Sequence, residues 1–230
     1  MPTRTPLLLP LLTASLFAAV PAAGQEARPL DPARVPATGA RVQDFVPRDW
    51  RVAQQAIGDL NGDGRADRVL RVVPRSETHD PGDVTAGPDG HVIVVLLGEA
   101  GGRLRRGGVA PRLLKSGMPQ YALEMSIRRG VLVVSQHYGM TRVVDLTHRF
   151  RWDAATRRFL LIGRDELVFT RPQRMDPQVR RSENYLTGVR LITTGVAENN
   201  RIVRESTRRE RIPRTRTPME NVDELERWPS

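Results

Sequence analysis

The chain has 230 residues, which suits one well-buried domain and is short for two. Hydrophobic residues make up 39% and charged residues 27%, as in soluble globular proteins, and an aromatic share of 5% disfavours a sugar-binding surface built from rings. There is no cysteine, which excludes disulfides and a lipid-attached cysteine, so the fold must be held by its core, with or without a bound ion.

Residues 1–24 have the features of an export signal. A short positive region, "MPTR", precedes the apolar run "LLLPLLTASLFAAV", and small residues at 22–24 suit cleavage by signal peptidase. The alternative, a retained membrane anchor, is disfavoured because the run is shorter than the ~20 residues needed to span a bilayer. We therefore expect an exported protein, periplasmic or secreted, with no transmembrane segment after signal removal.

Residues 25–43 are rich in Pro, Ala and Arg and have no apolar periodicity. This composition predicts a flexible linker between the signal and the folded domain.

Residues 44–212 contain short runs rich in Val, Ile and Leu, separated by Gly, Pro, Asn or Asp. Several runs alternate apolar and polar residues, which is the period of a half-buried strand. The connections are short enough for hairpins, and long amphipathic helices between the runs are missing. The pattern predicts a single, mainly β domain, an antiparallel meander of about eight to ten strands with few helices. Whether the meander forms a curved sheet or a barrel-like domain stays open.

Two segments do not fit the meander. Residues Pro74 to Gly90 form a long polar loop, and loops of this length are usually functional or disordered. Residues 213–230 form a basic and then acidic tail. A short helix is expected there, with Thr217 as its cap and Pro218 at its first position.

The stretch "GDLNGDGRADRVL" carries oxygen-bearing side chains at loop positions one, three, five and nine, with a backbone carbonyl available at position seven and Gly64 at position six. The predicted ligands are Asp59, Asn61, Asp63, the Arg65 carbonyl and Asp67. This spacing surrounds a hard cation with oxygen, and calcium suits it better than magnesium. Three carboxylates would also repel one another without a cation. The alternative is a solvated β-turn, since Asn, Asp and Gly all favour turns.

An EF-hand does not fit, because position twelve is Leu70 where a bidentate Glu is needed, and a strand-like run follows. The order strand, "GDLNGDGRAD", strand resembles the calcium loop of FG-GAP and VCBS-type repeats, seen in integrin-like propellers. The chain also resembles a group of exported, mostly uncharacterised bacterial proteins with a single loop of this kind. This resemblance implies export and an ion-bound β domain, and it implies no activity.

No catalytic motif is evident in the sequence. The four histidines form no HExxH or H-x-H pair. Ser135 and His137 share one face of a predicted strand near Asp145, but we interpret them as polar residues on the outer face. Asp165 and Glu166 are adjacent and should point to opposite faces. A periplasmic hydrolase with an unrecognised site remains an alternative, and a protein that is not an enzyme is favoured.

All but one of the 36 basic residues are arginine, and the formal net charge is +10. The densest run lies near the carboxyl end and includes Arg201, Arg204, Arg208, Arg209 and Arg211. It suits weak association with an anionic component of the cell envelope. Interspersed glutamates and the lack of aromatic residues for base stacking make nucleic acid an unlikely partner.

The sequence thus leaves three hypotheses. The favoured one is an exported, calcium-binding β domain in which the ion has a structural role, acting as a binding or envelope-associated module. The alternatives are the periplasmic hydrolase and an anion-binding protein that uses the Arg-rich segment.

Overall fold

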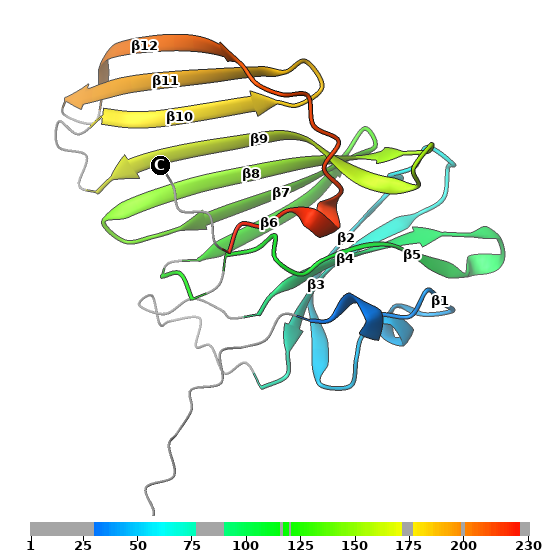
Figure 1. Cartoon of the computed structure of the whole chain (residues 1–230). Helices are drawn as coiled ribbons and strands as arrows, with labels where there is room; N and C mark the ends of the chain where they lie inside the picture. Colours follow the sequence, from blue (N-terminus) through cyan, green and yellow to red (C-terminus); the bar gives the residue numbers. More distant parts are fainter. Residues whose placement is uncertain are drawn as a thin grey trace, which may run out of the picture.

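The computed structural model describes residues 30–76, 90–115, 117–119, 121–171, 177–198 and 201–225. The expected signal at 1–24, most of the loop from Pro74 to Gly90 and the last five residues lie outside this part of the chain. Two antiparallel sheets make up the fold (Figure 1). The prediction of a mainly antiparallel β fold with few helices is confirmed, and neither sheet closes into a barrel.

The first sheet has the strand order β1-β5-β4-β3-β2 and the second the order β12-β11-β10-β9-β8-β7-β6. The strands are β1 (Thr38–Gly39), β2 (Trp50–Gly58), β3 (Asp67–Pro74), β4 (Val92–Gly98), β5 (Leu104–Ala110), β6 (Ala122–Arg128), β7 (Val131–Tyr138), β8 (Arg142–Asp153), β9 (Arg158–Thr170), β10 (Pro177–Asn184), β11 (Val189–Glu198) and β12 (Arg201–Arg211). Short 3-10 helices occur at Pro32–Arg34 (η1), Val42–Phe45 (η2), Ala100–Gly102 (η3) and Met219–Asn221 (η4). The second sheet is a simple meander, in which each strand pairs with its neighbour in sequence.

Strand β4 is apolar along almost its whole length because both of its faces are covered. Ile93 and Val95 belong to the core that lies between the two sheets, together with Leu132 and Phe150 of the second sheet. The alternate residues of β4, such as Val94, belong to a separate core on the other face of the first sheet. A strand buried on both faces needs no polar alternation, which explains its continuous run of Val, Ile and Leu.

The amino-terminal segment 30–43 is part of the folded domain, so the prediction of a flexible linker over 25–43 is wrong from Leu30 onward. Leu30 and Val35 are buried against the outer face of the first sheet. The segment contains η1, β1 and the beginning of η2. Strand β1 pairs with β5. The segment has few apolar residues and a strand of only two residues, so its sequence shows no hydrophobic periodicity.

The carboxyl-terminal segment also belongs to the core. After β12 the chain runs back toward the first sheet (Figure 1), and Pro218 pairs with Leu160 of β9. The expected helix is present only as three residues, η4, and its cap is Pro218, one residue after the predicted cap Thr217. Met219 is fully buried and lies over Gly108 of β5. A Cβ added to Gly108 would come within 2.7 Å of the Met219 sulfur. The described part of the chain contains no helix long and apolar enough to cross a membrane.

Candidate functional site

The loop that joins β2 to β3 folds around the side chain of Asp59. Its Oδ1 accepts a hydrogen bond from the Gly62 amide at 2.7 Å, and its Oδ2 accepts one from the Gly64 amide at 2.9 Å. Gly62 and Gly64 have φ values of +80° and +77°, a region that side chains disfavour. Gly64, at loop position six, therefore has the positive φ that a sharp turn at this position requires.

Asn61 and Asp63 cap the next two turns of the same loop. Asn61 Oδ1 accepts from the Asp63 amide at 3.0 Å, and Asp63 Oδ1 accepts from the Arg65 amide at 2.9 Å. Arg65 also forms an ion pair with Asp63, with Nη1 and Oδ2 3.1 Å apart. The hydrogen bond from the Arg65 amide is the largest cause of the lowered pKa of Asp63. Asp63 is therefore an ionised carboxylate whose charge is partly met within the loop.

Asp67 begins β3 and is fully buried. Its Oδ2 accepts from the Leu60 amide and its Oδ1 from the Gly98 amide, both at 2.8 Å, so it ties the loop to the end of β4. Burial raises the pKa of Asp67, and the negative charges of Asp63 and Asp59 raise it further. The three carboxylates of the predicted calcium loop are thus close enough to repel one another.

The loop fits a cation in its chemistry and only partly in its arrangement. Carboxylate and amide oxygens are the ligands that calcium prefers. Each carboxylate oxygen retains acceptor capacity beyond the hydrogen bonds it already takes. Among the described residues, however, no group of three or more His, Cys, Asp or Glu side chains is arranged to hold a metal. Asp67 in particular directs both oxygens at backbone amides.

Ser135, His137 and Asp145 lie on one face of β7 and β8, as their spacing predicted. His137 Nδ1 lies 2.5 Å from Asp145 Oδ1, while Ser135 Oγ bonds to Thr147 Oγ1 at 3.0 Å. These residues line a hollow of about 300 Å³. The serine hydroxyl therefore faces threonine across the strand pair, which is not the arrangement of an activated nucleophile.

Asp165 and Glu166 point to opposite faces of β9, which confirms that prediction. Asp165 bonds to Arg149 at 2.5 Å and to Ser182 at 2.8 Å on one face. Glu166 accepts from Arg164 at 3.3 Å and from Arg181 at 3.4 Å on the other. The face of Glu166 is continuous with the core between the sheets.

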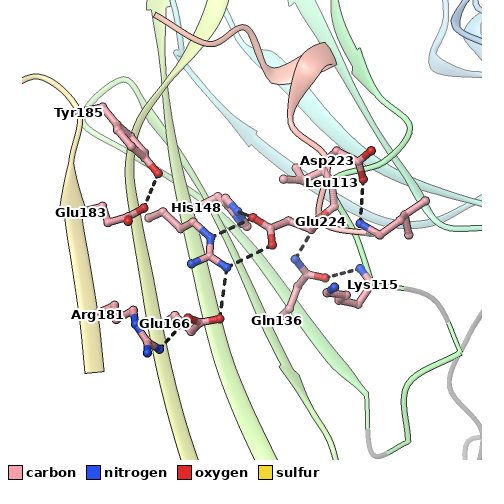
Figure 2. Close-up of polar contacts among 12 residues, drawn as sticks. Leu113, Lys115, Gln136, His148, Glu166, Arg181, Glu183, Tyr185, Asp223 and Glu224 are labelled. Carbon is pink, nitrogen blue, oxygen red and sulfur yellow. Dashed lines mark hydrogen bonds and ion pairs between the residues drawn. The ribbon is translucent and has the colours of Figure 1, made fainter. Parts of the chain in front are cut away.

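A cluster of buried charged and polar side chains lies on that inner face (Figure 2). We call it the charged cluster; its members are His148, Arg164, Glu166, Glu183 and Glu224. Glu224 Oε1 lies 2.9 Å from His148 Nε2 and accepts from Arg164 Nε at 2.9 Å. Burial opposes the ionisation of Glu224, but hydrogen bonds from His148 and Arg164 outweigh it and lower its pKa to about 2. The cluster therefore holds Glu224 as a buried carboxylate.

Contacts with the loop after β5 bring Glu224 to this position. The Glu224 amide donates to the Arg112 carbonyl at 2.8 Å, and Arg112 Nε donates to Asp223 at 2.6 Å. Nearby, Gln136 accepts from the Lys115 amide at 2.8 Å and donates to the Leu113 carbonyl at 3.2 Å. Figure 2 shows these contacts beside the charged cluster. The carboxyl-terminal segment is thus fixed by backbone and side-chain bonds.

A pocket of about 630 Å³ opens beside the charged cluster. It is lined by Arg164, Glu166, Arg181, Glu183, Tyr185, Arg190, Arg211, Ile212, Pro213 and Thr215. Glu183 pairs across the strands with Arg164, and Arg181 with Glu166, so opposite charges are neighbours on β9 and β10. Favourable cross-strand pairs of this kind stabilise a sheet, and here they also form the wall of a pocket.

β12, which carries the Arg-rich run, is the edge strand of the second sheet. Arg204, Arg208, Arg209 and Arg211 are exposed, and Arg208 forms an ion pair with Glu210 at 2.8 Å. The side chain of Arg201 lies outside the described structure. A charged edge of this type also protects a sheet from pairing with another chain.

Comparison with known proteins gives no match: no family model matches the chain, and no curated protein or solved structure matches it.

The sequence reasoning missed the charged cluster, although part of it left a signal. Arg164 and Glu166 are two residues apart on one strand, as are Arg181 and Glu183 on the next, and side chains at that spacing share a face. Both pairs have the order Arg-x-Glu, so antiparallel pairing of the two strands places each arginine opposite a glutamate. Nothing in the sequence indicated that Glu224, from the end of the chain, would complete it.

Proposed function

We propose that the protein is an exported β domain that binds calcium at the β2–β3 loop, where the ion has a structural role, and that it acts as a binding or envelope-associated module. The observation that carries the proposal is that one tight loop, ordered by backbone amides that donate to its carboxylates, brings Asp59, Asp63 and Asp67 together. Burial is the main cause of the raised pKa of Asp67, and the charges of Asp63 and Asp59 add to it. A divalent cation removes this repulsion between carboxylates. Asp59, Asn61, Asp63, the Arg65 carbonyl and Asp67 are the proposed ligands.

The expected gain in stability is modest. Extracellular calcium sites bind in the range of ~0.1 to 1 mM. With ~1 mM free calcium and a dissociation constant of ~0.1 mM, binding to the folded state adds about 1.4 kcal/mol. Because the loop is already ordered by its own hydrogen bonds, the domain folds without the ion and is stabilised by it.

The test is isothermal titration calorimetry with calcium on the wild type and on Asp63→Asn. We expect the wild type to bind one calcium ion and Asp63→Asn to bind it at least roughly tenfold more weakly, because a charged ligand is lost. Asp153→Asn is the matched control, since Asp153 caps a turn outside the loop by accepting from the Thr156 amide at 2.9 Å. Wild-type affinity in Asp63→Asn, or no calcium heat in the wild type, would reject the proposal.

A second candidate function, association with an anionic envelope component, is favoured by the exposed arginines of β12. Arg204, Arg209 and Arg211 take part in no ion pair among the described residues, so their charges are available to a partner. Binding to vesicles containing an anionic phospholipid should weaken steeply between low and physiological salt, because such attraction is screened. Equal binding to neutral vesicles would argue against it.

A further inference from the structure

The pocket beside the charged cluster contains more hydrogen-bond donors than acceptors. Its two carboxylates, Glu166 and Glu183, are both engaged. Arg190 Nε donates to Glu183 Oε1 at 2.7 Å, and the Tyr185 hydroxyl donates to Glu183 Oε2. Burial opposes the ionisation of Glu183, but these two hydrogen bonds lower its pKa overall. Both oxygens of Glu183 therefore already face hydrogen-bond donors of the protein.

Glu166 accepts from two arginines on its face, and one of them, Arg164, also donates to Glu224. Arg164 Nη2 reaches it at 3.3 Å and Arg181 Nη1 at 3.4 Å. Both distances are long for a charge-assisted hydrogen bond, which is usually 2.7 to 2.9 Å. Glu166 thus pairs loosely with both arginines, and Arg164 is held more closely by Glu224, at 2.9 Å.

Several guanidinium nitrogens of Arg164 and Arg181 make no hydrogen bond within the described structure. Arg164 is 6% exposed and uses Nε and Nη2 on Glu224 and Glu166. Within the described structure, Arg164 Nη1 and Arg181 Nε and Nη2 make no hydrogen bond. None of these three nitrogens is among the buried side-chain atoms that lack a hydrogen bond in the described residues, so each reaches solvent or the pocket, where water or a partner can bond to it. Both arginines line the pocket, so the pocket is where that partner would lie.

The residues that line the pocket carry more positive than negative charge. Four arginines and two glutamates line it, a difference of two positive charges. Glu224 and Glu210, just outside the lining, carry two negative charges that balance this excess, since Glu224 bonds to Arg164 and Glu210 lies 3.5 Å from Arg190. The attraction for an anion is therefore local and directed by guanidinium geometry.

The size and remaining walls of the pocket constrain the rest of the ligand. A volume of about 630 Å³ is far larger than a free oxyanion needs and lies in the range of pockets that hold small organic molecules. Tyr185, Ile212 and Pro213 supply apolar surface, and Thr215 contributes a hydroxyl. We propose that this pocket binds a small organic oxyanion, a carboxylate or phosphate ester on a body the size of a sugar, with Arg181 and Arg164 Nη1 as the oxyanion ligands.

The test compares four probes built on the same hexose body by isothermal titration calorimetry: glucuronate, glucose 6-phosphate, glucose and glucosamine. We expect saturable binding of glucuronate or glucose 6-phosphate, and whichever binds identifies the oxyanion. Glucose and glucosamine should not bind measurably. Arg181→Gln should weaken binding roughly 10- to 100-fold, the usual effect of losing hydrogen bonds to a charged group. Arg181→Lys keeps the charge and loses the planar guanidinium, so its affinity should lie between those of the wild type and Arg181→Gln. If Arg181→Gln does not fold, weaker binding by Arg181→Lys than by the wild type is the deciding result.

Arg180→Gln is the matched control, because Arg180 is adjacent in β10, points to the opposite face and is exposed. It makes the same change in net charge and should leave affinity within about twofold, the effect expected of a distant surface charge. Equal losses in Arg180→Gln and Arg181→Gln, tighter binding of glucosamine, or no binding by either anionic probe would overturn the proposal. The titrations are repeated in chelator; the pocket lies in the second sheet, so this proposal stands or falls independently of calcium.

Discussion

Replacing Glu224 by Gln tests the energetic role of the charged cluster. The substitution keeps the size and shape of the side chain and removes the charge that meets Arg164 and His148. Glu224 is fully buried, so its partners would face a neutral amide with no water to replace the lost interaction. Removing one partner of a buried ion pair typically costs about 3–5 kcal/mol.

The pKa of Glu224 gives a second, independent magnitude. A folded pKa of about 2 against the usual 4.5 corresponds to roughly 3 kcal/mol of stabilisation by the ionised form. Because the folded pKa is the lower one, this stabilisation is fully present above pH 4.5 and is lost as the pH falls toward 2. At pH 3 we expect roughly 1 to 2 kcal/mol of it to remain.

The assay is urea unfolding of the wild type and Glu224→Gln at pH 7 and pH 3. The difference in unfolding free energy should be roughly 3 kcal/mol or more at pH 7 and clearly smaller at pH 3. Asp223→Asn is the control, since the side chain of Asp223 is 37% exposed and its pair with Arg112 should be worth less than about 1 kcal/mol. Equal losses for the two variants at pH 7, or a loss in Glu224→Gln that does not change with pH, would refute the reasoning.

Three further substitutions test the packing, each by urea unfolding at pH 7. Leu30→Ala should cost roughly 2–5 kcal/mol because Leu30 is buried, whereas a residue in a flexible linker would cost nothing. Met219→Ala should cost a similar amount, roughly 2–5 kcal/mol, and wild-type stability would show that the carboxyl-terminal segment does not dock. Gly98→Ala should cost roughly 1–3 kcal/mol, because its Cβ would lie 2.7 Å from the Ala66 carbonyl oxygen; an unchanged midpoint would contradict that close approach.

The strands were predictable because hydrophobic periodicity and turn residues are local signals. "RVVDLTHRFRW" alternates along β8, and the glycines of the β2–β3 loop have the positive φ that their positions indicate. The division into two sheets was not predictable, since it depends on which strands fail to pair. The same holds for segment 30–43, whose two buried residues, Leu30 and Val35, have no periodic neighbours.

The two candidate sites also differ in how far the sequence alone predicts them. The proposed calcium loop is contiguous, so the spacing from Asp59 to Asp67 could be read directly from the sequence. The pocket brings together β9, β10, β11, the end of β12 and the chain after it. The charged cluster beside it is completed by Glu224, 60 residues from its partner Arg164. Charged residues far apart in sequence reveal a common site only once strand pairing fixes their register.

The most direct test of the central claim is a thermal melt of residues 25–230, first in chelator and then in rising calcium, with magnesium as the control. We predict that the midpoint rises with calcium, saturates in the millimolar range or below, and responds much less to magnesium. A midpoint that does not move with calcium, or that moves equally with magnesium, would contradict a calcium site at the β2–β3 loop.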